Sequence, residues 1–150
     1  MKVEEKLKKL GIILPDPPKP VGAYTNAVEA GGFVFVAGST PGRGFKRGKV
    51  GKDLTLEEGY EAAKTTAIFS LAKLKALIGD LDRVERVIRV IGYVNSADGF
   101  IQQPAVMNGF TELLINIYGE EVGKPARAAI AVSAEGWFPV EAYMTVKLKP

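Results

Sequence analysis

One arginine in the last third of the chain has no acidic residue within several positions of it in the sequence. Arg127 lies in the alternating run Ala126–Val132, and its neighbours in that run are apolar. On a β-strand Arg127 would share a face with Ala129 and Ala131, whose methyl groups leave the guanidinium uncovered. A guanidinium presents a planar fork of donors that matches a carboxylate. Arg127 therefore either meets a carboxylate from elsewhere in the fold or binds an anionic ligand.

The final apolar stretch supplies a candidate carboxylate. Residues 138–148 alternate between apolar and polar positions, and Glu141 falls on the more polar face. We expect the short turn 134–137 to fold this strand back on the Arg127 strand, which would place Arg127 and Glu141 on one face. Two interpretations stay open. An exposed ion pair would contribute only about 0–1 kcal/mol to stability, whereas the alanines at 129 and 131 suit an anion-binding site.

Composition removes several kinds of chemistry. The 150 residues include no Cys and no His, so thiolate nucleophiles, Ser-His-Asp triads and zinc catalysis are excluded, and we expect no metal and no cofactor. The formal charge of +3 is too weak to require nucleic acid. Absent Cys and His beside plentiful Glu and Lys favour a thermophilic source.

A glycine-rich loop at 42–51 gathers four basic residues. They are Arg43, Lys46, Arg47 and Lys49. The loop could contact phosphates, but only Phe45 interrupts it and no aromatic platform is visible, so a solvated loop is the favoured interpretation. Its glycines do not lead into a helix with dinucleotide-binding spacing. RNA is therefore a possible binding partner, but a less favoured one than a small molecule.

The predicted elements form one α+β domain over residues 1–150. Thr55 and Glu58 form a capping-box pattern before a long apolar stripe that ends at Gly79. Continuous apolarity at 33–37 predicts burial of that strand on both faces. A mixed sheet with two helices on one face should result. In order, we expect an N-terminal helix (2–10), a proline-rich connector completing 1–20, strands at 24–30 and 33–37, a helix to 78, a strand at 84–94, a helix from Pro104 to Tyr118, and strands near 126–133 and 138–148.

The N-terminal segment is charged throughout and lacks the apolar stretch of a signal peptide. No segment reaches the roughly 18 apolar residues of a membrane-spanning helix. We therefore expect a soluble, cytoplasmic protein that does not interact with membranes.

Five short motifs in a fixed order resemble the RidA/YjgF-type proteins, the reactive intermediate deaminases that are also called L-PSP endoribonuclease-like. The resemblance covers roughly residues 14–150 and rests on the order and spacing of the pieces together. They are residues 14–24, 33–41, 92–96, 125–127 and 139–142.

This resemblance implies a chorismate-mutase-like fold and a homotrimer with sites in clefts between subunits. Arg127 would then grip a substrate carboxylate and Glu141 would help to position the attacking water, together with a backbone carbonyl near Ala129. The implied reaction converts a reactive 2-imino or enamino acid to a 2-keto acid and ammonia without a cofactor. Four further residues match positions that line the cleft: Tyr24, Gly38, Phe100 and Asn108.

Two departures from the family pattern indicate a divergent subgroup. Ala129 stands where many members carry Cys, and Ala37 where many carry Ser. Two alternatives to the deaminase therefore remain. One is a non-catalytic trimer that binds small carboxylates as a sensor or chaperone, and the other is an endoribonuclease.

Overall fold

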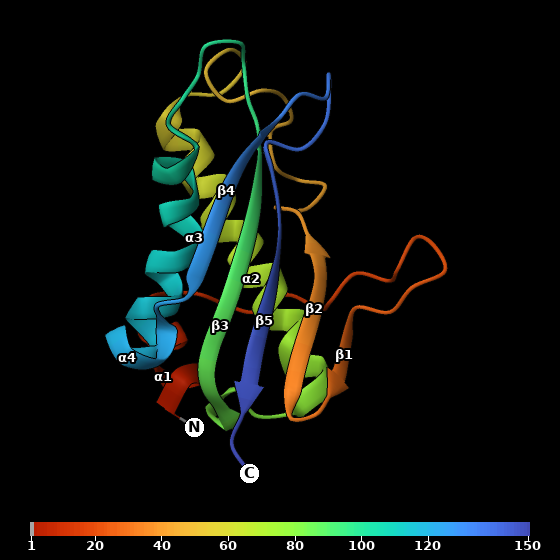
Figure 1. Ribbon diagram of the computed structural model, residues 1–150, viewed down its shortest axis with the longest axis vertical. Helices are drawn as coiled ribbons and strands as arrows, with labels where there is room; N and C mark the ends of the chain where they lie inside the picture. Colours follow the sequence, from red (N-terminus) through yellow and green to blue (C-terminus); the bar gives the residue numbers. More distant parts are fainter. Residues whose placement is uncertain (1) are drawn as a thin grey trace.

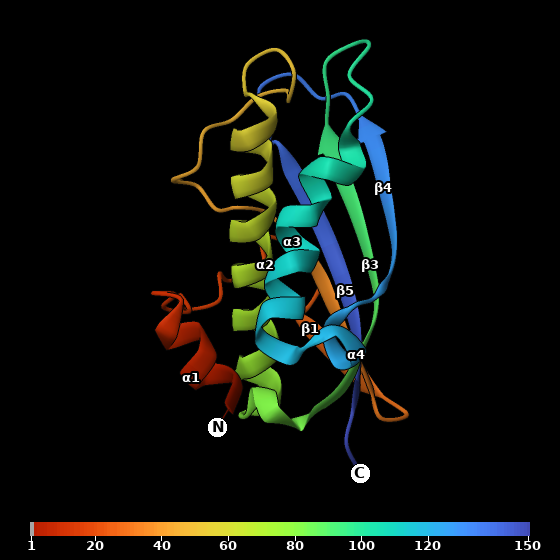
Figure 2. The ribbon, with the colours of Figure 1, turned by 90° about the vertical axis from the view of Figure 1, so that its left-hand side faces the viewer.

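The computed structural model describes residues 2–150, in which two long helices cover one face of a five-stranded mixed sheet (Figures 1 and 2). This confirms the predicted α+β class and helix placement. The elements are α1 (Lys2–Lys9), β1 (Ala27–Ala30), β2 (Phe33–Ser39), α2 (Leu56–Ile78), a 3-10 turn η1 (Leu81–Arg83), β3 (Val84–Asn95), α3 (Gln103–Tyr118), α4 (Glu120–Gly123), β4 (Ala126–Val132) and β5 (Val140–Leu148).

The strand order is β1-β2-β5-β3-β4, and β3 lies between β4 and β5 (Figure 1). β3 and β4 are parallel, while the other neighbours are antiparallel. The prediction that β5 folds back on β4 is therefore wrong. With 12 residues, β3 offers two long edges, and β4 and β5 each pair with one of them. The connection between them crosses the end of β3 instead of forming a hairpin.

Asn95 organises that crossing, although its position suggests a turn residue. It lies at the end of β3 and is 1% exposed. Its side-chain amide donates to the carbonyl of Ala134 (2.7 Å) and its Oδ1 accepts from the amide of Ala134 (2.9 Å). Asn95 thus satisfies both the backbone amide and the backbone carbonyl of Ala134. These two hydrogen bonds fix the path from β4 to β5.

The two long helices follow their sequence patterns closely. Thr55 and Glu58 exchange both capping-box hydrogen bonds at the start of α2, and Gly79 ends it with φ 84°. The approach of α3 to α2 depends on Gly109. A Cβ there would lie 2.0 Å from the carbonyl oxygen of Tyr60, so only glycine permits this helix crossing.

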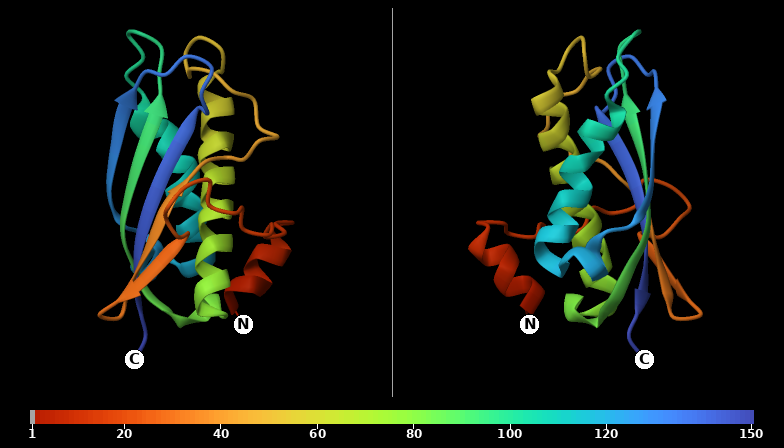
Figure 3. Two further views of the ribbon diagram at one scale, coloured as in Figure 1. Left: turned by 90° about the vertical axis from the view of Figure 1, so that its right-hand side faces the viewer. Right: turned by 60° about the vertical axis from the view of Figure 1, so that its left-hand side comes forward.

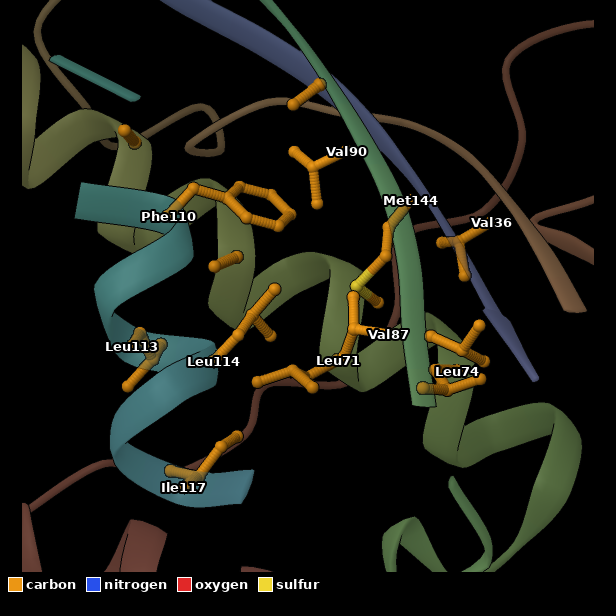
Figure 4. Close-up of a cluster of buried hydrophobic side chains, with 14 of the residues drawn as sticks. Val36, Leu71, Leu74, Val87, Val90, Phe110, Leu113, Leu114, Ile117 and Met144 are labelled. Atoms are coloured by element: carbon orange, nitrogen blue, oxygen red, sulfur yellow. The ribbon is translucent and has the colours of Figure 1, made fainter. Parts of the chain in front are cut away.

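The core lies between the helix layer and the sheet. Leu71 and Leu74 from α2, Phe110 and Leu114 from α3, and Met144 from β5 are fully buried there (Figure 4). Burying each such side chain contributes about 1.5–3 kcal/mol. This layer rather than β-propensity therefore sets which face of each strand points inward.

The opposite face of the sheet is open. Val34 and Val36 are buried, but Phe35 between them is 49% exposed, so the predicted burial of 33–37 on both faces is wrong for this chain alone. Val28 on β1 pairs with Phe35 and is equally exposed. Ile130 and Val132 extend the exposed apolar residues to the β4 edge. An apolar sheet face of this kind is typical of a surface that another chain covers.

Helix α1 packs on the outer side of the helix layer (Figure 3). Val3 and Leu7 are buried, which confirms the amphipathic pattern. The carboxylate of Asp82 accepts from the backbone amides of Lys2 (2.7 Å) and Val3 (2.9 Å) and so caps this helix from a distant part of the chain. Within residues 2–150, no helix combines the length and apolarity needed to cross a membrane.

Candidate functional site

The chain does not bring its two predicted catalytic residues together. Arg127 pairs with Val90, which is buried under the helices, so Arg127 lies on the helix face of β4. Glu141 pairs with Tyr93 and lies on the open face, since its strand neighbours Val140 and Ala142 are the buried ones. β3 separates the two strands. The prediction that Arg127 and Glu141 share a face is therefore wrong within one chain.

Arg127 is held at the free edge of the sheet by helix α3. Its Nη1 donates to Asn108 Oδ1 (2.8 Å) and to Thr111 Oγ1 (3.2 Å). Within residues 2–150 it forms no ion pair. Burial lowers the pKa of Arg127 and the charge of Glu112 opposes this change, but the guanidinium stays protonated. One nitrogen thus carries both protein contacts, and the rest of the fork is available.

Glu112 gives this edge a second feature. The hydroxyl of Tyr60 donates to Glu112, and this bond raises the pKa of Tyr60 to about 12. Tyr60 of α2 holds the carboxylate of Glu112 on α3, and the charge of this carboxylate influences Arg127. The negative charge nearest to Arg127 is therefore engaged elsewhere.

Glu141 lies in an open pocket of about 910 Å³ at the far end of β2. β1 pairs with β2 as far as Val36, and the amide of Ala37 still donates to the carbonyl of Asn26 (2.8 Å), so the outer side of β2 is uncovered only beyond Ala37, where the register between β2 and β5 shifts. A Cβ at Gly38 would lie 2.9 Å from Oε2 of Glu141. The carboxylate therefore rests directly against the backbone of Gly38.

Lys73 of α2 completes this pocket, and the sequence analysis missed it. The residue is 5% exposed, and its Nζ donates to the carbonyl of Gly38 (2.9 Å). Burial lowers the pKa of Lys73, and the charge of Glu141 opposes this change. Lys73 shares a flank of α2 with the buried Thr66 and Ser70, outside the stripe that contains Leu71 and Leu74, so the apolar pattern gave no signal for it. Gly38 thus carries a buried amine on one side and a carboxylate on the other.

The predicted site residues divide into two groups. The pocket contains Tyr24, Gly38 and Glu141, with Ala37 also on its wall. Arg127, Asn108 and Ala129 gather at the β4 edge, where Thr111 is an addition that the sequence did not reveal.

Phe100 belongs to neither group. It packs against the core, and a Cβ at Gly51 would lie 2.9 Å from its ring. Among residues 2–150, no group of three or more His, Cys, Asp or Glu side chains is arranged to hold a metal ion. The chemistry on offer is a free guanidinium fork at one edge, and a carboxylate beside a buried amine in the pocket.

Comparison with known proteins identifies the class to which this architecture belongs. Residues 4–148 match the family model described as "YjgF/chorismate mutase-like, putative endoribonuclease". Protein TCP17 of Trypanosoma cruzi is 38% identical over 135 residues, which is 88% of this chain and 84% of that protein. A RutC family protein of Pyrococcus horikoshii is 31% identical over 123 residues, covering 81% of this chain and 83% of the relative. The chain belongs to the YjgF/RidA family.

Solved structures agree with this assignment. The Agrobacterium tumefaciens protein Atu1372, described as having unknown function, is 33% identical with a TM-score of 0.87. The match covers 98% of this chain and 92% of the Atu1372 chain. A Shewanella oneidensis structure described as a "putative endoribonuclease" is 26% identical with a TM-score of 0.92, covering 99% and 100%. RidA from an Antarctic Psychrobacter, at 22% identity and a TM-score of 0.55, shares the fold.

Proposed function

We propose that the protein hydrolyses reactive 2-imino or enamino acids to 2-keto acids and ammonia, in sites that form between the subunits of a homotrimer. The observation that carries this proposal is the division of the site. Within residues 2–150, Arg127 presents a fork without an ion-pair partner at one edge of the sheet, while Glu141 lies in a separate pocket whose lining does not include Arg127 of the same chain. Each half supplies what the other lacks.

The outer surfaces of the chain support assembly. The open sheet face exposes apolar side chains, and β4, which carries Arg127, has no neighbour on its outer edge. Packing the β4 edge of one subunit toward the β2 end of the next would cover apolar surface and bring the two half-sites together. Closed cyclic assembly requires such a heterologous contact between two different surfaces of the same chain. The expected mass is three times 16.1 kDa.

The proposed chemistry needs only the guanidinium of Arg127, the carboxylate of Glu141 and a water molecule. Arg127 binds the substrate carboxylate and fixes the orientation of the C=N carbon. Water, oriented by Glu141, adds to that carbon and passes a proton toward the nitrogen. Collapse of the resulting carbinolamine forms the C=O bond, breaks the C–N bond and releases ammonia. The substrate is already electrophilic, so a weak base such as a carboxylate is sufficient.

A coupled assay tests this function. An enzyme that generates 2-aminoacrylate releases pyruvate at a slow spontaneous rate, and added protein should accelerate that release. Arg127→Ala should abolish the acceleration, and Arg127→Lys should retain little of it because an ammonium lacks the fork. Lys9→Ala, which removes an exposed cation at the end of α1, should behave as wild type. No acceleration by the wild-type protein with several imino acids would refute the proposal.

Binding without turnover is the second candidate function. Ala129 offers no reactive side chain beside Arg127, whereas the fork itself needs nothing more to hold a carboxylate. This alternative predicts saturable, Arg127-dependent binding of 2-keto acids and no pyruvate acceleration.

The endoribonuclease interpretation has less support. Lys46 and Lys49 of the basic loop are ion-paired with Glu58 and Glu135, which leaves fewer cations for phosphates. We expect RNA to stay intact at low salt, where phosphate contacts are strongest.

A further inference from the structure

The Glu141 pocket carries far more positive charge than its single carboxylate balances. Four cationic side chains line it: Lys19, Arg43, Arg47 and Lys73. Of the residues 2–150 that the structure describes, Glu141 is the only acidic one on its wall. Within residues 2–150, none of the four forms an ion pair, although five other lysines do. Four cations beside one carboxylate leave the wall of this pocket with a net positive charge.

Lys73 is the strongest indication that the excess serves a ligand. Its side chain is buried, and its ammonium has one hydrogen-bond acceptor, the carbonyl of Gly38. Removing an ammonium from water costs several kcal/mol unless anions or acceptors replace the lost solvation. A leucine or methionine at position 73 would avoid this cost. An anion in the pocket would provide the missing partner.

Two arginines are positioned at the same opening. The guanidinium carbon of Arg47 lies 4.4 Å from the ring centre of Phe138, and this stacking leaves the N–H groups at the guanidinium edge free. Arg43 follows Gly42, where a Cβ would lie 2.8 Å from the ring of Phe69. The loop is thus pressed onto α2 just before Arg43. The Phe138 ring thus holds the fork of Arg47 at the pocket, and the loop backbone places Arg43 beside it; within residues 2–150, neither is ion-paired with a carboxylate.

We propose that this pocket binds a second anionic group of the substrate, so that the preferred ligands are 2-imino acids with an additional acidic group, and their 2-keto acid products. This inference rests on the proposed function, in which Arg127 of an adjacent subunit takes the first carboxylate. The second acidic group, a carboxylate or a phosphate, then lies against Lys73, Arg47 and Arg43. A substrate with an apolar side chain would leave these cations uncompensated.

Calorimetric titration of the assembled protein with two keto acids and one enol phosphate tests the proposal separately from catalysis. Three ligands suffice: 2-oxobutyrate with one acidic group, 2-oxoglutarate with two carboxylates, and phosphoenolpyruvate with a carboxylate and a phosphate. We expect 2-oxoglutarate or phosphoenolpyruvate to bind about tenfold or more tightly than 2-oxobutyrate, since a hydrogen bond to a charged group contributes about 1.5–3 kcal/mol. Whichever of the two binds more tightly identifies the second group.

Variants assign the preference to the pocket. Lys73→Met and Arg47→Gln should remove most of the discrimination while changing 2-oxobutyrate affinity little. Lys64→Met, on the same helix but outside the pocket, should retain the discrimination. Arg127→Ala should weaken all three ligands. Equal affinity for all three, or a preference that survives Lys73→Met and Arg47→Gln together, would overturn the inference.

The two proposals fail in different ways. Tighter binding of ligands with two acidic groups, without any turnover of imino acids, would refute the deaminase function but support the pocket assignment. Turnover of imino acids with equal affinity for all three ligands would refute the pocket assignment alone.

Discussion

The close contact between Gly38 and Glu141 allows the position of the carboxylate to be tested without disturbing the fold. A methyl group at position 38 would lie 2.9 Å from Oε2 of Glu141, whereas ordinary contact begins at 3.4 Å. The carboxylate would therefore move by about 0.5 Å, the difference between these two distances. Gly38 has no positive φ, so alanine fits its backbone without strain. We expect Gly38→Ala to leave the fold intact.

Activity should respond much more strongly than stability. A misplacement of about 1 Å can cost on the order of 100-fold in rate, so a shift of half that size should lower kcat/KM about tenfold. Because the displaced atom belongs to a side-chain terminus, the unfolding free energy should change by less than about 1 kcal/mol. The assays are pyruvate release and urea unfolding. Gly44→Ala is the matched control, since a Cβ there meets nothing within 4 Å. Unchanged kcat/KM in Gly38→Ala would refute the role given to Glu141.

Two further predictions concern stability. Asp82→Ala should lower the unfolding free energy by about 1 kcal/mol at neutral pH, the usual contribution of a helix N-cap. The backbone amides of Val3 and Lys2 lower the pKa of Asp82. Its contribution to stability is therefore present above the unfolded pKa of about 3.9 and is lost as the pH falls through the folded pKa. Urea unfolding of the wild type and the variant should show that the difference in their unfolding free energies shrinks at acidic pH. Gly109→Ala should destabilise by about 1–3 kcal/mol through overpacking against the Tyr60 carbonyl, and a melting temperature equal to that of Gly44→Ala would contradict this reason.

Local patterns predicted the helices because their causes are local. Thr55 and Glu58 lie three residues apart, and Gly79 supplies the positive φ that ends α2, so neither depends on distant contacts. The pairing of β5 had no such local cause. Residues 134–137 look like a hairpin turn, but β3 offered β5 an edge that the short β4 could not match. Strand partners are chosen by long-range burial, which alternation in one strand does not reveal.

The sequence suggested candidate site residues but not their arrangement in space. Alternation along the strands singled out Arg127 and Glu141, and the resemblance to the family added Tyr24 and Gly38, but the face assignments for Arg127 and Glu141 depended on the wrong hairpin. Lys73 was hidden for a different reason. It lies outside the apolar stripe of α2, at a position where a lysine commonly extends its ammonium to solvent. Only the path of β2 shows that the carbonyl of Gly38 keeps this ammonium in the pocket.

The separation of Arg127 from Glu141 makes a quantitative prediction about mixed assemblies. If each site takes Arg127 from one chain and Glu141 from its neighbour, Arg127→Ala and Glu141→Gln are inactive alone but complementary together. In a randomly assembled equal mixture, a site is intact when the chain giving Arg127 carries only the Glu141 change and the other carries only the Arg127 change. Each condition holds half the time, so about a quarter of the sites should be intact.

Unfolding and refolding the two variants together should therefore restore about a quarter of wild-type activity. Refolding each variant separately before mixing should restore none, which controls for trace contamination. A site built within a single chain would give no recovery in either case, because every chain in the mixture would lack one of the two residues. That result would require Arg127 and Glu141 to act on one face of one subunit, which the pairing of Arg127 with Val90 and of Glu141 with Tyr93 does not allow.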